Sequence, residues 1–142
     1  RSPRDLDLLE AQDALRYCGG PETTSSLMDR LEAYDLALIP TMPGSLAAAH
    51  SLPSRMVTCL SSRLPLLVLG DASCGAGAFV RKFGVGARVP WEGGGTLRDT
   101  VSALVDLGRE QAFDESIEGL FAGPLSLSVQ QERLRQLFSA PS

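Results

Sequence analysis

The sequence has few of the side chains on which most catalytic and metal sites depend. Its 142 residues include a single histidine, His50, and a single lysine, Lys82. One histidine leaves very little from which to build a zinc site or a Ser-His-Asp triad. The three cysteines, Cys18, Cys59 and Cys74, are unclustered and lie on apolar segments. We therefore expect reduced, mostly buried thiols of a cytoplasmic protein, with no disulfide framework and no metal site.

Two classes of partner are excluded by what the chain lacks. The formal net charge is -4 and Lys and Arg form no cluster, so there is no electrostatic footprint for nucleic acid. No apolar run approaches the length that spans a bilayer, and residues 1–5 do not resemble a signal peptide. The hydrophobic fraction of 44% is typical of soluble globular proteins. We expect one cytoplasmic domain over residues 1–142, without a nucleic-acid partner or a transmembrane segment.

Helical and strand patterns alternate along the chain, and this alternation predicts the fold class. Segments of strand character occur at residues 14–18, 36–39, 66–69 and 87–90. Segments with helical spacing lie at residues 6–11, 23–33, 54–62, 78–83, 96–107, 114–121 and 128–138. The order predicts an α/β domain with a Rossmann-like parallel sheet and helices on both faces. The run at 36–39 is continuously apolar, so we expect it to be an inner strand covered on both faces.

Three loops are expected to leave the carboxyl ends of strands, where parallel sheets bind their ligands. They span residues 19–22, 40–52 and 70–77, and all three are rich in small residues. Small side chains allow backbone N–H groups to approach a ligand closely. The shared placement of these loops predicts a ligand site at this edge of the sheet.

Pro53-Ser54-Arg55 starts a predicted helix directly after the second of these loops. Ser54 is a natural N-cap, and the unpaired N–H groups of a helix start bind anions. Arg55 lies in the first turn, where the helix dipole does not favour a positive side chain, so its presence there is better explained by an anion bound outside the helix. The alternative is an exposed arginine that contacts only solvent. The segment predicts a phosphate site.

The order of these segments resembles the C-terminal, nucleotide-sugar-binding half of group-1-like GT-B fold glycosyltransferases. Residues 34–41 resemble the family's "ADVFVLPS" strand, 53–55 its "PSK" element, 64–65 its Gly-x-Pro turn and 83–86 its "GVG". The likeness covers roughly residues 14–107, and C-terminal helices follow at about 110–139. It implies a domain that lacks the first strands of the complete family domain.

The resemblance also implies a function. The chain would be the donor-binding half of a hexosyltransferase-type enzyme, which takes a nucleotide-diphosphate sugar as substrate and needs no metal or other cofactor. Helix dipoles and cations neutralise the leaving diphosphate in such enzymes. The residues that it assigns to the donor diphosphate are Gly44, Ser45, Ser54 and Arg55, and Gly75 and Gly77 form a candidate nucleotide loop.

Two positions depart from the family pattern. Thr58 stands where the family has the acidic residue that binds the donor ribose, and one hydroxyl is a poor replacement for a carboxylate. Arg63 stands where the family has a turn glycine. The acceptor domain of the family is missing as well, so we do not expect a complete active site and predict no catalytic residue. A partner domain or subunit would supply the acceptor side.

Two other interpretations remain open from the sequence. A non-catalytic, degenerate glycosyltransferase-like domain that serves assembly or regulation is favoured by Thr58. An unrelated Rossmann-like domain, such as a flavodoxin-like or epimerase fragment, is the more distant alternative. No G-x-G-x-x-G opens a helix, which counts against a dinucleotide site.

Overall fold

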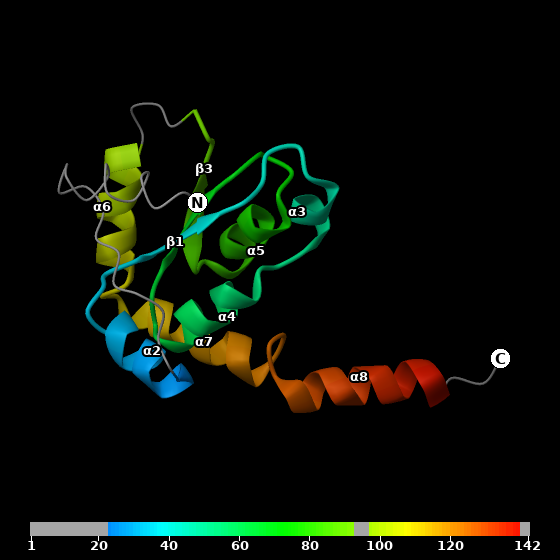
Figure 1. The fold of residues 1–142 in the computed structure, drawn as a ribbon. Coiled ribbons are helices and arrows are strands. Elements are labelled where there is room, and N and C mark those ends of the chain that lie inside the picture. Colours follow the sequence, from blue (N-terminus) through cyan, green and yellow to red (C-terminus); the bar gives the residue numbers. More distant parts are fainter. Residues whose placement is uncertain (1–22, 93–96, 140–142) are drawn as a thin grey trace.

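The computed structural model describes residues 23–92 and 97–139, which form a parallel sheet with helices packed against it (Figure 1). The strands are β1 (Ala37–Pro40), β2 (Leu66–Leu69) and β3 (Gly86–Val89), in the order β1-β2-β3. Ala37 pairs with Leu66, and Leu66 with Gly86, both in parallel register. This arrangement confirms the predicted Rossmann-like α/β fold.

Seven helices lie within the described residues: α2 (Thr24–Leu31), α3 (Leu46–His50), α4 (Ser54–Ser61), α5 (Gly75–Phe83), α6 (Leu97–Leu107), α7 (Gln111–Ala122) and α8 (Leu127–Ser139). The short helix α3 was expected to be loop, and α5 begins three residues earlier than expected. The helix predicted at 6–11, the strand at 14–18 and the loop at 19–22 lie outside the described residues. Among the helices that are described, none is long and apolar enough to cross a membrane.

The larger core lies on one face of the sheet. Ile39, Leu66 and Val68 point into it from the strands, α4 contributes Met56 and Leu60, and α5 contributes Ala76 and Val80. Helix α7 belongs to the same core, since its buried side chains Phe113, Ile117 and Leu120 join this cluster. The opposite face carries a smaller cluster in which Leu104 of α6 packs on Leu67 and Val89. Figure 1 accordingly shows α6 on one side of the strands and α4 and α5 on the other.

Strand β1 lies at one edge of the sheet that the structure describes, and the expectation that both of its faces are covered was wrong. Ile39 is buried, whereas Leu38 is 52% exposed. The reason is that α6 packs on β2 and β3, which leaves the same face of β1 uncovered. Pro40 at the end of the strand suits an edge, because proline has no N–H to donate to a neighbouring strand.

The turn between α4 and β2 contains the one non-glycine residue with positive φ among those described. Arg63 has φ +56°, the left-handed conformation that glycine adopts at least cost. Its guanidinium contacts Asp114 at 2.5 Å and Glu118 at 3.1 Å. The hydrogen bonds that Arg63 donates to these two carboxylates raise its pKa. The side chain thereby ties this turn to α7.

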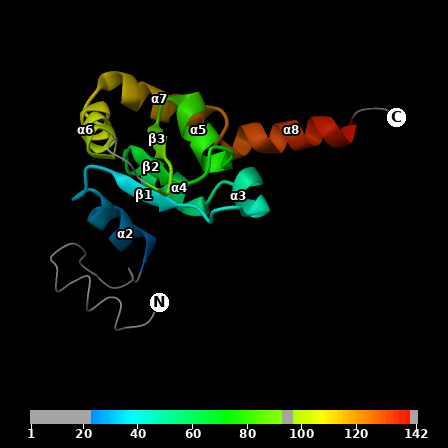
Figure 2. The ribbon, with the colours of Figure 1, turned by 90° about the horizontal axis from the view of Figure 1, so that it is seen from above.

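Helix α8 extends away from the sheet and the other helices, as Figures 1 and 2 both show. Its first residue, Leu127, is 73% exposed. Leu125, between α7 and α8, still packs against the core.

Candidate functional site

The loops that follow β1 and β2 meet at the carboxyl edge of the sheet. The N–H group of Gly44 in the first loop donates to Oδ2 of Asp71 in the second, at 2.7 Å. Helix α3 lies beside α5, and a Cβ atom on Gly75 would lie 3.0 Å from the carbonyl oxygen of Ala49. Glycine at this position therefore allows α5 to start against the end of α3. Two of the three loops predicted to share this edge are thus side by side.

A tight turn shapes the loop after β1. The N–H of Ser45 donates to the carbonyl oxygen of Met42 at 3.4 Å, with Pro43 and Gly44 at the two central positions. Proline presets the backbone of the first central position, and Gly44 has φ +65°, as the second position of a Pro-Gly turn requires. Ser45 then caps α3, since its Oγ accepts the N–H of Ala48 at 3.4 Å.

Partly buried hydrogen bonds hold the strand ends beneath these loops. Thr41 is 8% exposed, and its hydroxyl donates to the carbonyl oxygen of Leu69 at 2.9 Å. The indole N–H of Trp91 donates to the carbonyl oxygen of Thr41 at 3.0 Å. Arg88 of β3 donates from Nη1 to the carbonyl oxygen of Gly70 at 2.8 Å. All three strands are therefore connected at the edge where the two loops lie.

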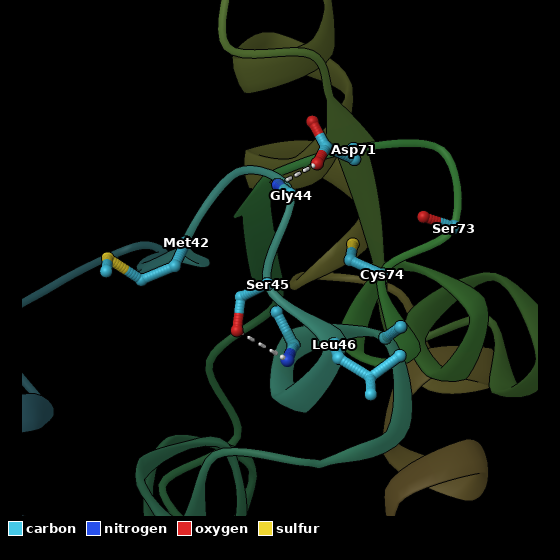
Figure 3. Close-up of a pocket in the computed structure, with 9 residues that line it drawn as sticks. Met42, Gly44, Ser45, Leu46, Asp71, Ser73 and Cys74 are labelled. Atoms are coloured by element: carbon cyan, nitrogen blue, oxygen red, sulfur yellow. Dashed lines mark hydrogen bonds between the residues drawn. The ribbon is translucent and has the colours of Figure 1, made fainter.

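The first of two hollows at this edge is acidic. It has a volume of about 220 Å³ and lies between the β1–α3 loop and the β2–α5 loop. Figure 3 shows Met42, Ser45 and Leu46 on one side, and Asp71 and Ser73 on the other. Asp71 is exposed, and Gly44 holds only one of its two oxygens.

The second hollow is lined by a positively charged side chain, Arg55. It also measures about 220 Å³, and Arg55, Ser51 and Pro53 line it together with the end of β1. The Nη2 group of Arg55 donates to the carbonyl oxygen of Pro40 at 2.6 Å. Residues that line both hollows are Met42, Ser45 and Ala48. The two hollows therefore adjoin, with a carboxylate beside one and a guanidinium beside the other.

The residues predicted to bind the diphosphate are only partly brought together. Ser45 and Arg55 line the same hollow, and Gly44 lines the neighbouring one, where its N–H is already bonded to Asp71. Ser54 lines neither hollow. The expectation that Ser54 caps α4 was wrong, because Pro53 is the N-cap residue and no side chain caps this helix. Thr58 is half-buried on α4 and lines neither hollow.

Gly75 and Gly77 lie in the first turn of α5 rather than in a loop. A Cβ atom on Gly77 would lie 2.7 Å from Cδ of Arg88 and 2.9 Å from Sγ of Cys74. Close packing of the helix against β3 therefore accounts for the glycine here. Cys74 is the N-cap of α5, and its sulfur accepts the N–H of Gly77 at 3.3 Å.

The described part of the chain contains two free thiols and no metal-binding cluster. Cys59 and Cys74 are free thiols, while Cys18 lies outside the described residues. Burial raises the pKa of Cys59, and the nearby charge of Arg55 opposes that shift only in part. Among the described residues, no group of three or more His, Cys, Asp and Glu side chains is placed to hold a metal ion. His50 is exposed at the end of α3.

Asp71 is the residue of this edge that sequence reasoning missed. The available signal was its position directly after Gly70, at the carboxyl end of a predicted strand. Comparison of the chain with protein-family models, with curated proteins and with solved structures finds no match in any of the three.

Proposed function

We propose that this domain is the nucleotide-sugar donor-binding half of a glycosyltransferase, as the resemblance of its motifs implies. One observation carries the proposal. Arg55 from the first turn of α4 and Ser45 from the β1–α3 loop line a single hollow at the carboxyl edge of the parallel sheet. Ligands of such sheets bind at this edge. Both residues belong to the set that the resemblance assigns to the donor diphosphate.

The Arg55 guanidinium has the chemistry that a diphosphate requires. It is always charged and carries several N–H donors, of which one is bonded to the carbonyl oxygen of Pro40 at 2.6 Å. That bond holds the side chain beside the hollow and leaves further donors for phosphate oxygens. During glycosyl transfer, negative charge accumulates on the leaving diphosphate, so a fixed cation stabilises the transition state more than the ground state. The acceptor and its base would come from a partner domain or subunit.

Nucleotide titration tests this proposal. We expect UDP, GDP or ADP to bind the folded domain in isothermal titration calorimetry, and Arg55→Ala to weaken that binding roughly tenfold through loss of a charge-assisted contact. The matched control is Arg133→Ala, which removes an exposed arginine on α8 and should leave the affinity unchanged. If none of the three nucleotides binds at millimolar concentration while circular dichroism shows a folded domain, donor binding is refuted.

The position of Thr58 favours one alternative, a non-catalytic domain that serves assembly or regulation. The residue has no carboxylate for a ribose and lines neither hollow. Thr58→Glu, with Thr58→Gln as the uncharged control, separates the two functions. A gain in nucleotide affinity with Glu alone indicates a donor pocket that has lost its ribose contact. Absence of nucleotide binding in all three proteins supports the non-catalytic function.

A further inference from the structure

Helix α2 contacts the end of α4 through a methionine sulfur. The hydroxyl group of Ser62, the C-cap residue of α4, donates to Sδ of Met28 at 3.3 Å, and Oγ of Ser61 lies 3.8 Å from the same sulfur. We propose that Met28 is an oxidation site, at which a peroxide converts the thioether to a sulfoxide. The new oxygen accepts hydrogen bonds from these serines and holds α2 more firmly against α4. The inference is independent of the proposed donor binding.

The chemistry of this step requires only a peroxide, of which hydrogen peroxide is the simplest. A lone pair of Sδ attacks one peroxide oxygen, the O–O bond breaks, and the other oxygen leaves as water. Sulfur loses two electrons and the peroxide gains them. A thioether is a weak hydrogen-bond acceptor, whereas a sulfoxide is polar. Because hydroxyl donors already lie at this sulfur, the new oxygen forms beside its hydrogen-bond partners.

The surroundings of Met28 distinguish it from the other two methionines of the chain. Met56 is 2% exposed in the larger core, where a sulfoxide would place a polar group among apolar side chains. Met42 is 76% exposed, so a sulfoxide there would face mostly solvent. Met28 is half-buried and belongs to neither apolar cluster of the described residues. Oxidation of Met28 therefore changes a polar contact without disturbing the core.

The short length of α2 makes this helix sensitive to a single contact. It has eight residues, and isolated helices shorter than about 12–15 residues are marginal in water. Tertiary contacts therefore stabilise α2, among them Met28 and Leu31, which packs against the larger core. Ser61 also donates to the carbonyl oxygen of Thr58 at 2.8 Å, so Ser62 is the main donor to the sulfur. A stronger bond to Met28 should reduce the local opening of α2.

Amide hydrogen exchange in the full chain measures this opening. The protein carries Met42→Leu, which removes the most exposed methionine, and is treated with hydrogen peroxide. Dithiothreitol then reverses sulfenic acids and disulfides at the cysteines, and peptide mass spectrometry establishes that Met28 is oxidised. Exchange of the amide groups of residues 27–32 is followed by NMR. The test variant is Ser61→Ala/Ser62→Ala, and the control is Ser102→Ala, an exposed serine on α6.

We expect oxidation to slow the exchange of these amide groups roughly threefold, the effect of one modestly stronger hydrogen bond. The response should persist in Ser102→Ala, disappear in Ser61→Ala/Ser62→Ala, and be reversed by methionine sulfoxide reductases. Unchanged or faster exchange overturns the proposal, as does a response that survives the loss of both serines. The proposal also fails if Met28 stays reduced under conditions that fully oxidise Met42 in the wild type.

A second pair of variants tests the hydrogen bond without peroxide, and it applies even if the double serine variant does not fold. Met28→Gln places an amide oxygen, a permanent acceptor, near the two serine hydroxyl groups, whereas Met28→Leu offers none. We expect slower exchange of residues 27–32 in Met28→Gln than in Met28→Leu. Equal or faster exchange in Met28→Gln overturns the role of the serines as donors.

Discussion

Replacement of Phe113 by alanine tests whether α7 is part of the core that supports the site. Phe113 is 1% exposed and lies in the cluster formed by the sheet, α4 and α5. A buried aromatic side chain covers about 150–250 Å², and its truncation to alanine typically costs about 3–5 kcal/mol. For a chain of this size, that cost lowers the melting temperature by roughly 10–20 °C. Stability is measured by urea unfolding and by thermal unfolding followed by circular dichroism.

Two further variants make the measurement interpretable. Phe113→Leu keeps most of the buried volume and should cost about 1 kcal/mol, so it remains measurable if the alanine variant unfolds. Leu127→Ala removes an apolar side chain that is 73% exposed on α8 and should change the stability by no more than about 0.5 kcal/mol. A loss below about 1 kcal/mol for Phe113→Ala would refute the packing of α7 described above.

Substitutions at four other positions probe the backbone and the site. Gly86→Ala places a Cβ atom 2.1 Å from the carbonyl oxygen of Leu66, so it should lower the free energy of unfolding in urea by about 1–3 kcal/mol. Gly119 is exposed and a Cβ atom there has nothing within 4 Å, so Gly119→Ala should raise the free energy of unfolding by about 0.5–1 kcal/mol. Arg63→Gly should retain more stability than Arg63→Ala, because both lose the contacts to α7 but only glycine adopts φ +56° without strain; equal stability would contradict this. The raised pKa of Cys59 stabilises the fold below the ordinary thiol pKa of about 8.5, and this contribution disappears as the pH rises through the higher folded value. Arg55→Ala should raise that pKa further and slow alkylation of Cys59 at pH 8, as measured by mass spectrometry of the labelled peptide; faster labelling would contradict the assignment.

Local signals in the sequence predicted most of the described fold. The apolar run at 66–69 corresponds to β2. Its four residues lie between Pro65 and Gly70, so the run is too short for a buried helix and fits a strand. Helix α2 begins where the helical spacing predicted it, with Thr23 as its N-cap, and the Thr23 hydroxyl accepts the N–H of Ser26. Helix α3 was not predicted because Pro43 and Gly44, which directly precede its N-cap, are typical of a turn and indicated a loop. The five residues that follow Ser45 nevertheless form a short helix, which the Ser45 side chain caps.

Contacts between distant segments were harder to predict. The exposure of Leu38 depends on which strands α6 covers, and this packing cannot be predicted from a local sequence pattern. Asp71 is one of 17 acidic residues, and its meeting with Gly44, 27 positions away, follows from the parallel pairing of β1 and β2. The resemblance predicted Ser45 and Arg55, which do share a hollow, although it did not predict the carboxylate beside them.

The edge of β1 has a consequence for aggregation. An open strand edge is a template on which another chain can add a strand. The N–H groups of Ala37 and Thr41 point toward β2, so the alternation of a parallel strand directs Leu38 and Pro40 outward. Pro40 has no N–H, and Arg55 occupies its carbonyl oxygen. Within the strand, only Leu38 is left to pair with a second chain at this edge of the described sheet, so the described edge offers few backbone groups for intermolecular strand addition.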